Sequence, residues 1–255
     1  MSVIVVVVLI VLVGGLIFAA GNRRSTARRN ELENAKAEAR RWVERLGGQV
    51  MNLSGTDTPS KQAMADASER YTAAGSQMDQ VQTAQQARLV TKTAMEGLYY
   101  VRAARTAMGL DPGPELPEDR EQRDAGRVTD DRRVSVEGHD YEASSQPGGR
   151  TPHYYPGGRV AGRPVPQGWY SEPWWKPALV AGAWGVGSFL LFDAMFSGMA
   201  GIPDAQAWES GFDAGQADAM ADMDAGGDAG GDMGGGDTGG DGGGFDWGGG
   251  DFGDF

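Results

Sequence analysis

Residues 168–185 read GWYSEPWWKPALVAGAWG, and the interpretation of this stretch decides how the rest of the chain is organised. Tryptophans, a tyrosine and two prolines lead directly into an apolar segment that contains several glycines. Only one residue between Trp174 and Phe192 is charged, and that residue is Lys176 near the start. A helix over this stretch would be about 28 Å long, close to the roughly 30 Å of a bilayer core. We therefore expect a second membrane segment over residues 174–202.

The aromatic side chains before this segment fit the boundary between lipid and water, where amphipathic rings prefer to lie. The residues expected at this membrane interface are Trp169, Tyr170, Trp174, Trp175 and Lys176. Asp193 then interrupts the apolar run and is the candidate intramembrane polar site. Because of Asp193 and the glycines, a segment that re-enters or lies in the interface stays as the alternative.

The first membrane segment is clearer. Residues 3–20 read VIVVVVLIVLVGGLIFAA and are uncharged, which gives about 27 Å of helix. Only Met1 and Ser2 precede the run, so the basic start of a cleaved signal is missing. The basic residues follow instead, at Arg23, Arg24, Arg28 and Arg29. The positive-inside rule then predicts a transmembrane anchor over residues 1–22, with the N-terminus outside, residues 23–173 in the cytoplasm and, after two spans, the tail outside.

Charge is divided unevenly along the chain. No basic residue follows Lys176, and 14 of the 35 acidic residues lie at or after Asp193, so the net charge of −12 describes the tail. The part before it carries a net charge of only +2, which argues against nucleic acid as a partner. The chain has no cysteine, which excludes disulfides, thiolate metal sites and cysteine nucleophiles.

Residues 23–110 have a helical pattern. Apolar residues recur every three or four positions from Leu32 to Leu46, and Ser54 and Gly55 follow as a stop. A second helix is then expected, with Thr58 as its N-cap and Pro59 as its first helical residue. The spacing of Thr83 and Gln86 predicts a capping box that opens a third helix. We expect an antiparallel helical bundle or hairpin; one continuous coiled-coil rod after Pro59 is the alternative.

The second half of the cytoplasmic part has a different composition. We expect a polar linker over residues 111–131 and a small β-hairpin over residues 132–145, where apolar residues alternate around a turn at Gly138. The hairpin would have to pack on the helices or on another copy. Residues 146–173 contain PGGR twice and predict an extended Pro/Gly-rich strap that leads to the second membrane segment.

Two further groups of residues are candidates for interaction. The stretch LYYVRAARTAMG brings aromatic and basic side chains together, and an ordinary solvated helix face is its alternative. The tail, residues 203–255, is rich in Gly and Asp and is expected to be disordered, with spaced aromatic residues that could dock on a partner. The candidate interaction residues are Tyr99, Tyr100, Arg102, Arg105, Phe245, Trp247 and Phe252.

Catalytic signatures are missing from the sequence. There is no phosphate-binding loop, no GxSxG and no HExxH. The two histidines, His139 and His153, lie in polar or proline-rich connections without a pattern of paired carboxylates. We therefore predict no enzyme activity, no catalytic or metal site and no cofactor.

Long strings in the chain carry a resemblance to a known family. They include EGLYYVRAARTAMGLDPGPEL and TPHYYPGGRVAGRPVPQGWYSEPWWKPALVAGAWG, followed by an acidic, glycine-rich end. Over roughly residues 44–201 the chain resembles an actinobacterial family of membrane-anchored proteins of unknown function. The resemblance implies an anchored helical domain in a bacterial membrane and supplies no site residues.

These observations predict a mainly α protein with two membrane segments, a helical domain, a β-hairpin and a disordered tail. The function that fits this organisation is a non-enzymatic, membrane-anchored scaffold or adaptor, which presents its helical domain to a protein partner. Small residues spaced four apart in both apolar segments, such as Ala178 and Gly182, also allow a homo-oligomer. The alternative function is a small transport or proton-linked component centred on Asp193.

Overall fold

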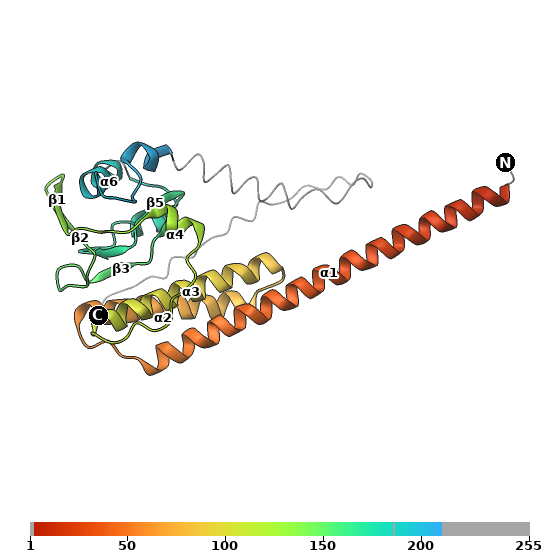
Figure 1. The fold of residues 1–255 in the computed structure, drawn as a ribbon, viewed down its shortest axis with the longest axis horizontal. Helices are drawn as coiled ribbons and strands as arrows, with labels where there is room; N and C mark the ends of the chain where they lie inside the picture. Colours follow the sequence, from red (N-terminus) through yellow and green to blue (C-terminus); the bar gives the residue numbers. More distant parts are fainter. Residues whose placement is uncertain (1–2, 186, 211–255) are drawn as a thin grey trace. The chain divides into compact units, whose positions relative to one another are not determined.

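The computed structural model describes residues 3–185 and 187–210, and their side chains from residue 26 onward. Three long helices form the first part: α1 (Val3–Asn52), α2 (Thr58–Asp79) and α3 (Ala84–Ala107). Helices α2 and α3 run side by side along the C-terminal half of α1 (Figure 1), and all three pack against one another. The predicted helical bundle is therefore confirmed, and the alternative of one continuous rod is wrong.

Side-chain caps break the chain into these helices. Thr83 accepts a hydrogen bond from the backbone of Gln86, and the Gln86 side chain accepts one in return, so the predicted capping box is confirmed. Helix α2 begins one residue earlier than expected, because Asp57 rather than Thr58 is the N-cap and forms a capping box with Ser60. Both caps satisfy N–H groups that a helix start leaves unpaired.

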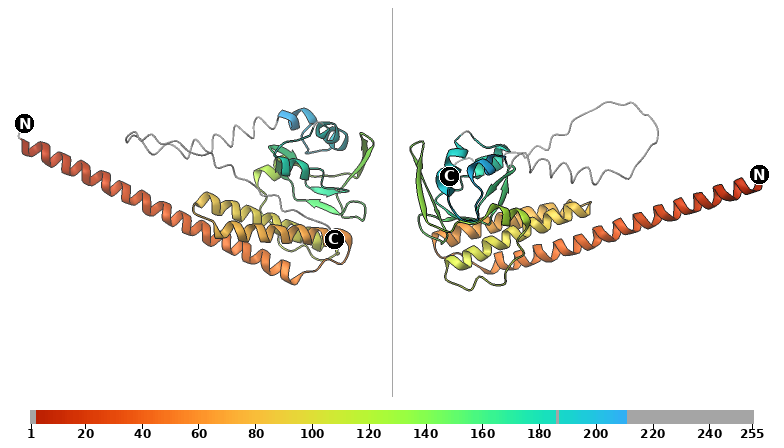
Figure 2. Two further views of the ribbon diagram at one scale, coloured as in Figure 1. Left: turned by 180° about the vertical axis from the view of Figure 1, so that it is seen from behind. Right: turned by 45° about the horizontal axis from the view of Figure 1, so that its top comes forward.

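Small residues allow the three helices to approach closely. The buried positions of the bundle are mostly alanines, including Ala39, Ala67 and Ala94 at 0% exposure. A Cβ atom at Gly97 of α3 would lie 2.4 Å from a Leu46 methyl group of α1. The views in Figure 2 agree that the three helices run alongside one another. Narrow alanine stripes thus bury little area per residue but permit tight packing on two neighbours.

The linker contains a helix that the sequence analysis missed. Helix α4 (Arg120–Ala125) begins at Asp119, which forms a capping box with Gln122. Its last residue, Ala125, is fully buried. The prediction of a plain polar linker over residues 111–131 is corrected here.

A small antiparallel sheet follows α4. The predicted hairpin is confirmed as β1 (Arg132–Val136) and β2 (His139–Ser144), joined by a two-residue turn in which Glu137 and Gly138 both have positive φ. Strands β6 (Gly168–Tyr170) and β3 (His153–Tyr155) extend the sheet in the order β1-β2-β6-β3. Strands β4 (Gly158–Val160) and β5 (Arg163–Val165) form a separate hairpin. Residues 146–173 are therefore a strand-forming part of the domain and not an extended strap.

The predicted second membrane helix is wrong. Residues 174–202 contain two short helices, α5 (Lys176–Ala181) and α6 (Ser188–Phe196), and α5 ends at Gly182 in the left-handed conformation. Within residues 26–185 and 187–210, no helix is long and apolar enough to cross a membrane. The apolar run is broken by backbone geometry and folds onto the sheet, where α6 packs on β1 and β2.

The aromatic residues are buried in hydrophobic cores and do not form an exposed belt: Tyr170, Trp174 and Trp175 belong to a second core, and Trp169 belongs to the core of the helical bundle. Trp169, Tyr170, Trp174 and Trp175 are at most 9% exposed, so the prediction that they lie at a membrane interface is corrected; Lys176 of the same group is exposed. Most of these rings contact one another edge-on or tilted, as at 5.1 Å between Tyr170 and Trp175. These rings fill a protein core, where the Tyr170 hydroxyl donates to Pro166 O at 2.6 Å and Trp174 Nε1 is buried without a hydrogen bond.

The predicted disordered tail begins too early. Trp208 is fully buried, donates from Nε1 to Pro164 O at 2.8 Å and stacks on Phe192 with ring centroids 4.7 Å apart. Residues 205–210 are helical. Residues 203–210 thus belong to the second core. Of the other predicted features, the rest of the tail with Phe245, Trp247 and Phe252 lies outside the described residues.

Candidate functional site

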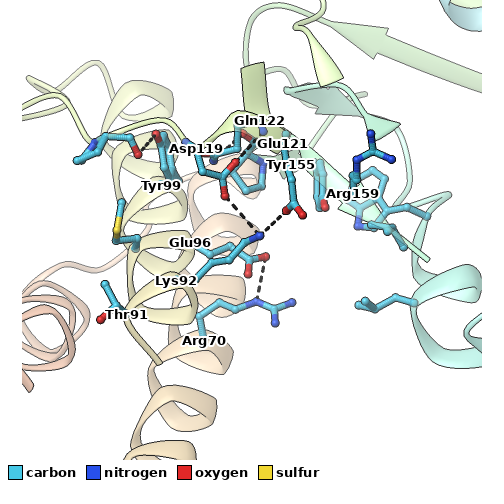
Figure 3. Close-up of a pocket in the computed structure, with 18 of the residues that line it drawn as sticks. Arg70, Thr91, Lys92, Glu96, Tyr99, Asp119, Glu121, Gln122, Tyr155 and Arg159 are labelled. Atoms are coloured by element: carbon cyan, nitrogen blue, oxygen red, sulfur yellow. Dashed lines mark hydrogen bonds and ion pairs between the residues drawn. The ribbon is translucent and has the colours of Figure 1, made fainter. Parts of the chain in front are cut away.

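A cavity of about 340 Å³ lies between α3, α4 and the hairpin of β4 and β5. Helix α3 lines one wall with residues that share a face at spacings of four, namely Thr91, Lys92, Met95, Glu96 and Tyr99. The opposite wall is the turn Pro156–Arg159, and α5 closes one side. Figure 3 shows Arg70 and Lys92 pointing from the helices into the space between the walls, whereas Arg159 of the opposite wall donates to Gly162 O within its own hairpin.

Most of the cavity wall is apolar. Both hydrophobic cores contribute to it, the bundle core through Tyr99 and the second core through Tyr155, Val160 and Trp175. Met95, Pro156 and Leu179 complete the apolar lining. Trp175 is 4% exposed and contacts Tyr155 in a tilted arrangement, with ring centroids 4.8 Å apart. Leu179, in contrast, is 52% exposed, and the next residue, Val180, is 88% exposed. An apolar cavity therefore opens beside exposed apolar side chains, which is a common property of recognition sites.

Two groups of ion pairs stand at the edge of the cavity. Lys92 bonds Glu121 and lies 3.4 Å from Asp119, so α3 is tied to the start of α4. Burial opposes the charged form of Lys92, but the hydrogen bond and charge of Glu121 dominate and raise its pKa. Figure 3 shows both carboxylates converging on the Lys92 ammonium.

The second ion pair joins two helices of the bundle. Arg70 of α2 lies with Nε 3.3 Å from Glu96 Oε1 of α3. Burial raises the pKa of Glu96, and the charge of Arg70 partly offsets that effect. The Nε nitrogen of Arg70 is buried and forms no hydrogen bond with good geometry, so this arginine is only partly satisfied by its partner.

A buried carboxyl lies near the cavity. Asp66 of α2 is 8% exposed and lies 4.0 Å from Lys176 at the start of α5. Burial raises its pKa to about 6, although Lys176 and a hydrogen bond from Gln62 act in the opposite direction. Asp66 thus links the bundle to the helix that carries Leu179.

The candidate residues on α3 have structural contacts. Tyr99 and Tyr100 are 6% and 4% exposed, and the Tyr99 hydroxyl donates to Pro117 O at 3.2 Å. Arg102 donates to Gly113 O at 2.8 Å, and Arg105 donates to Asp111 O at 2.6 Å. Tyr99, Arg102 and Arg105 thus hold the segment that follows α3 in place, whereas Tyr100 contacts the Tyr154 ring edge-on. The expected open patch of basic and aromatic side chains is therefore not formed. The alternative, an ordinary solvated helix face, does not describe these residues either.

Asp193 does not lie inside a membrane helix. It is exposed on α6, on the side opposite the buried Leu191, Phe192 and Met195. The prediction of an intramembrane polar site is corrected for that reason, and no observation in the described residues favours a transport role. Among these residues there is also no group of three or more His, Asp or Glu that could hold a metal ion.

Comparison with family models, curated proteins and solved structures found no match for this chain. The described part of the chain is an α-helical bundle joined to a small antiparallel sheet with an aromatic core. Its cavity residues come from separate segments around residues 70, 92–99, 117–122, 155–160 and 175–179. One local signal could have identified part of this site, because Asp119 and Gln122 have the spacing of a capping box and place α4 beside the cavity.

Proposed function

We propose that this protein is a membrane-anchored adaptor whose folded domain binds a protein partner at the cavity between α3, α4 and α5. Residues 3–20 supply the anchor, and the arginines that follow keep the domain in the cytoplasm. With one anchor, everything after residue 22 lies on the cytoplasmic side, including the acidic tail.

One observation carries the proposal: the apolar cavity opens beside Leu179 and Val180, which are held exposed by a rigid base. Ala178, between Trp175 and Leu179, is 2% exposed and fixes α5 to the aromatic core. Large apolar side chains held at the surface cost free energy in water, and a partner that covers them recovers it. A protein partner can insert one apolar side chain into the cavity and cover α5 with its neighbours.

The charged groups also support binding rather than proton transfer. Lys92, Asp119 and Glu121 pair with one another, and Arg70 pairs with Glu96. Such pairs give the surface a fixed pattern of charge, which contributes more to the choice of partner than to the affinity of binding.

Site-specific crosslinking in native membranes tests the proposal. A photoreactive amino acid replaces Leu179 in the full chain, and the same residue replaces Met51, which is 74% exposed on α1, as the matched control. We expect a reproducible protein adduct at position 179 that is absent at position 51. An adduct of twice the chain mass would identify a second copy as the partner. Equal labelling at both positions, or no adduct at 179, would refute the proposal.

A further inference from the structure

The cavity contains a guanidinium group that its neighbours leave partly unpaired. Arg70 Nε lies 3.3 Å from Glu96 Oε1, and within the described residues the Arg70 guanidinium forms no hydrogen bond to a neighbour. Its side chain is 30% exposed, and Figure 3 shows the guanidinium pointing into the space between the helices and the opposite wall. An arginine in this position presents a planar pair of donors to whatever enters.

The charges around the cavity define the ligand further. Four cationic residues line it, Arg70, Arg88, Lys92 and Arg159, against the three carboxylates Glu96, Asp119 and Glu121. Arg88 pairs with Glu31, which lies outside the cavity, so the other charges of the lining balance. A ligand with one carboxylate adds less repulsion beside Glu96, Asp119 and Glu121 than a phosphate dianion would.

The apolar wall adds a second requirement. Met95, Tyr155 and Trp175 lie on the same cavity as Arg70, and about 340 Å³ accommodates one large side chain together with the backbone around it. A ligand that satisfies both features carries a carboxylate next to an apolar or aromatic group.

We infer that the cavity recognises a peptide segment of the partner in which an Asp, a Glu or the C-terminal carboxylate adjoins a large apolar side chain. The carboxylate accepts hydrogen bonds from the terminal nitrogens of Arg70, and the apolar side chain packs against Tyr155 and Trp175. This inference rests on the proposed adaptor function and names the chemistry of its partner.

Glu96 competes with the ligand carboxylate for Arg70 in this arrangement. Substitutions of Arg70 and of Glu96 should therefore change the affinity for the ligand in opposite directions. Replacing Arg70 removes the donor, so Arg70→Gln should lower the affinity for an acidic peptide about tenfold or more, the usual effect of a lost charged hydrogen bond. Replacing Glu96 frees Arg70 from its partner, so Glu96→Gln should raise the affinity for the same peptide several-fold. A residue that only supports the fold would not produce a gain. The double variant Arg70→Gln/Glu96→Gln leaves the net charge of the site unchanged and controls for a carboxyl left buried without its partner.

The experiment selects peptides from a random phage-displayed heptapeptide library on the full chain in lipid nanodiscs. Selected peptides are kept when they block crosslinking from a probe at Leu179, and their affinities are measured by fluorescence anisotropy on the wild type and the three variants. We expect acidic residues next to aromatic or aliphatic ones, weaker binding to Arg70→Gln and stronger binding to Glu96→Gln.

The remaining outcomes separate the two proposals. Peptides that block the cavity but lack acidic residues, or that bind Arg70→Gln as well as the wild type, overturn this inference and leave the adaptor function standing. If no selected peptide blocks the Leu179 probe and native membranes also give no adduct there, both are overturned.

Discussion

Removal of the Trp208 side chain is the sharpest perturbation of the second core. Trp208 is fully buried, stacks on Phe192 at an interplanar angle of 16°, and donates to Pro164 O at 2.8 Å. Truncation of a buried tryptophan to alanine costs about 3–5 kcal/mol, because contacts are lost and a cavity stays behind. The carbonyl oxygen of Pro164 also loses its donor, at a cost of about 1 kcal/mol.

A smaller substitution separates these two effects. Trp208→Phe keeps a ring against Phe192 but lacks the N–H, so we expect a loss of about 1–2 kcal/mol in the free energy of unfolding. Leu190→Ala on the neighbouring α6 is the control, since Leu190 is 55% exposed and a surface substitution usually changes stability by less than about 0.5 kcal/mol.

The assay is urea unfolding of the full chain in mild detergent, followed by far-UV circular dichroism so that the loss of a tryptophan does not disturb the signal. The expected order of destabilisation is Trp208→Ala, then Trp208→Phe, then Leu190→Ala. If Trp208→Ala unfolds at the same urea concentration as the wild type, residues 203–210 do not belong to the core and the reasoning fails.

Three further predictions concern backbone fit, titration and capping. A Cβ at Gly126, whose φ is 73°, would lie 2.1 Å from Gly201 O, so Gly126→Ala should lower the melting temperature by several degrees in calorimetry. Burial raises the pKa of Asp66 to about 6, so the neutral carboxyl favours the folded state and ionisation removes that advantage. From pH 4 to pH 7 the free energy of unfolding of the wild type should therefore fall by about 2–3 kcal/mol relative to that of Asp66→Asn, as measured by urea unfolding. The same pH dependence in both proteins would contradict this. Thr83→Ala should cost about 1 kcal/mol, whereas Thr83→Ser should restore the bond to Gln86 and the urea midpoint.

The helical bundle could be predicted from the sequence because its determinants are local. The spacing of Thr83 and Gln86 identifies a helix start without knowledge of the fold, and alternation around Gly138 identifies a hairpin. The strands after residue 146 were missed because they are three residues long, and their proline and glycine content predicts turns equally well.

The second core could not be distinguished from a membrane segment by composition. Ala178 is buried and Val180 is exposed, yet both belong to one uncharged run that fits lipid as well as a protein interior. The deciding features are the left-handed Gly182 and the partners of the tryptophans, such as Pro164 O, which are distant in sequence. The cavity was missed for the same reason, since its walls come from segments as far apart as Arg70 and Leu179.

In the cell, the cavity and α5 should be covered by a protein partner, and the exposure of Leu179 reports this most directly. The chain has no cysteine, so Leu179→Cys and Met51→Cys each provide one reactive thiol. The measurement is the rate at which a thiol reagent modifies each variant in freshly broken membranes and in the purified protein. We predict that position 179 is modified at least about tenfold more slowly in the membranes, while position 51 reacts at the same rate in both. Equal rates at position 179 would contradict the claim.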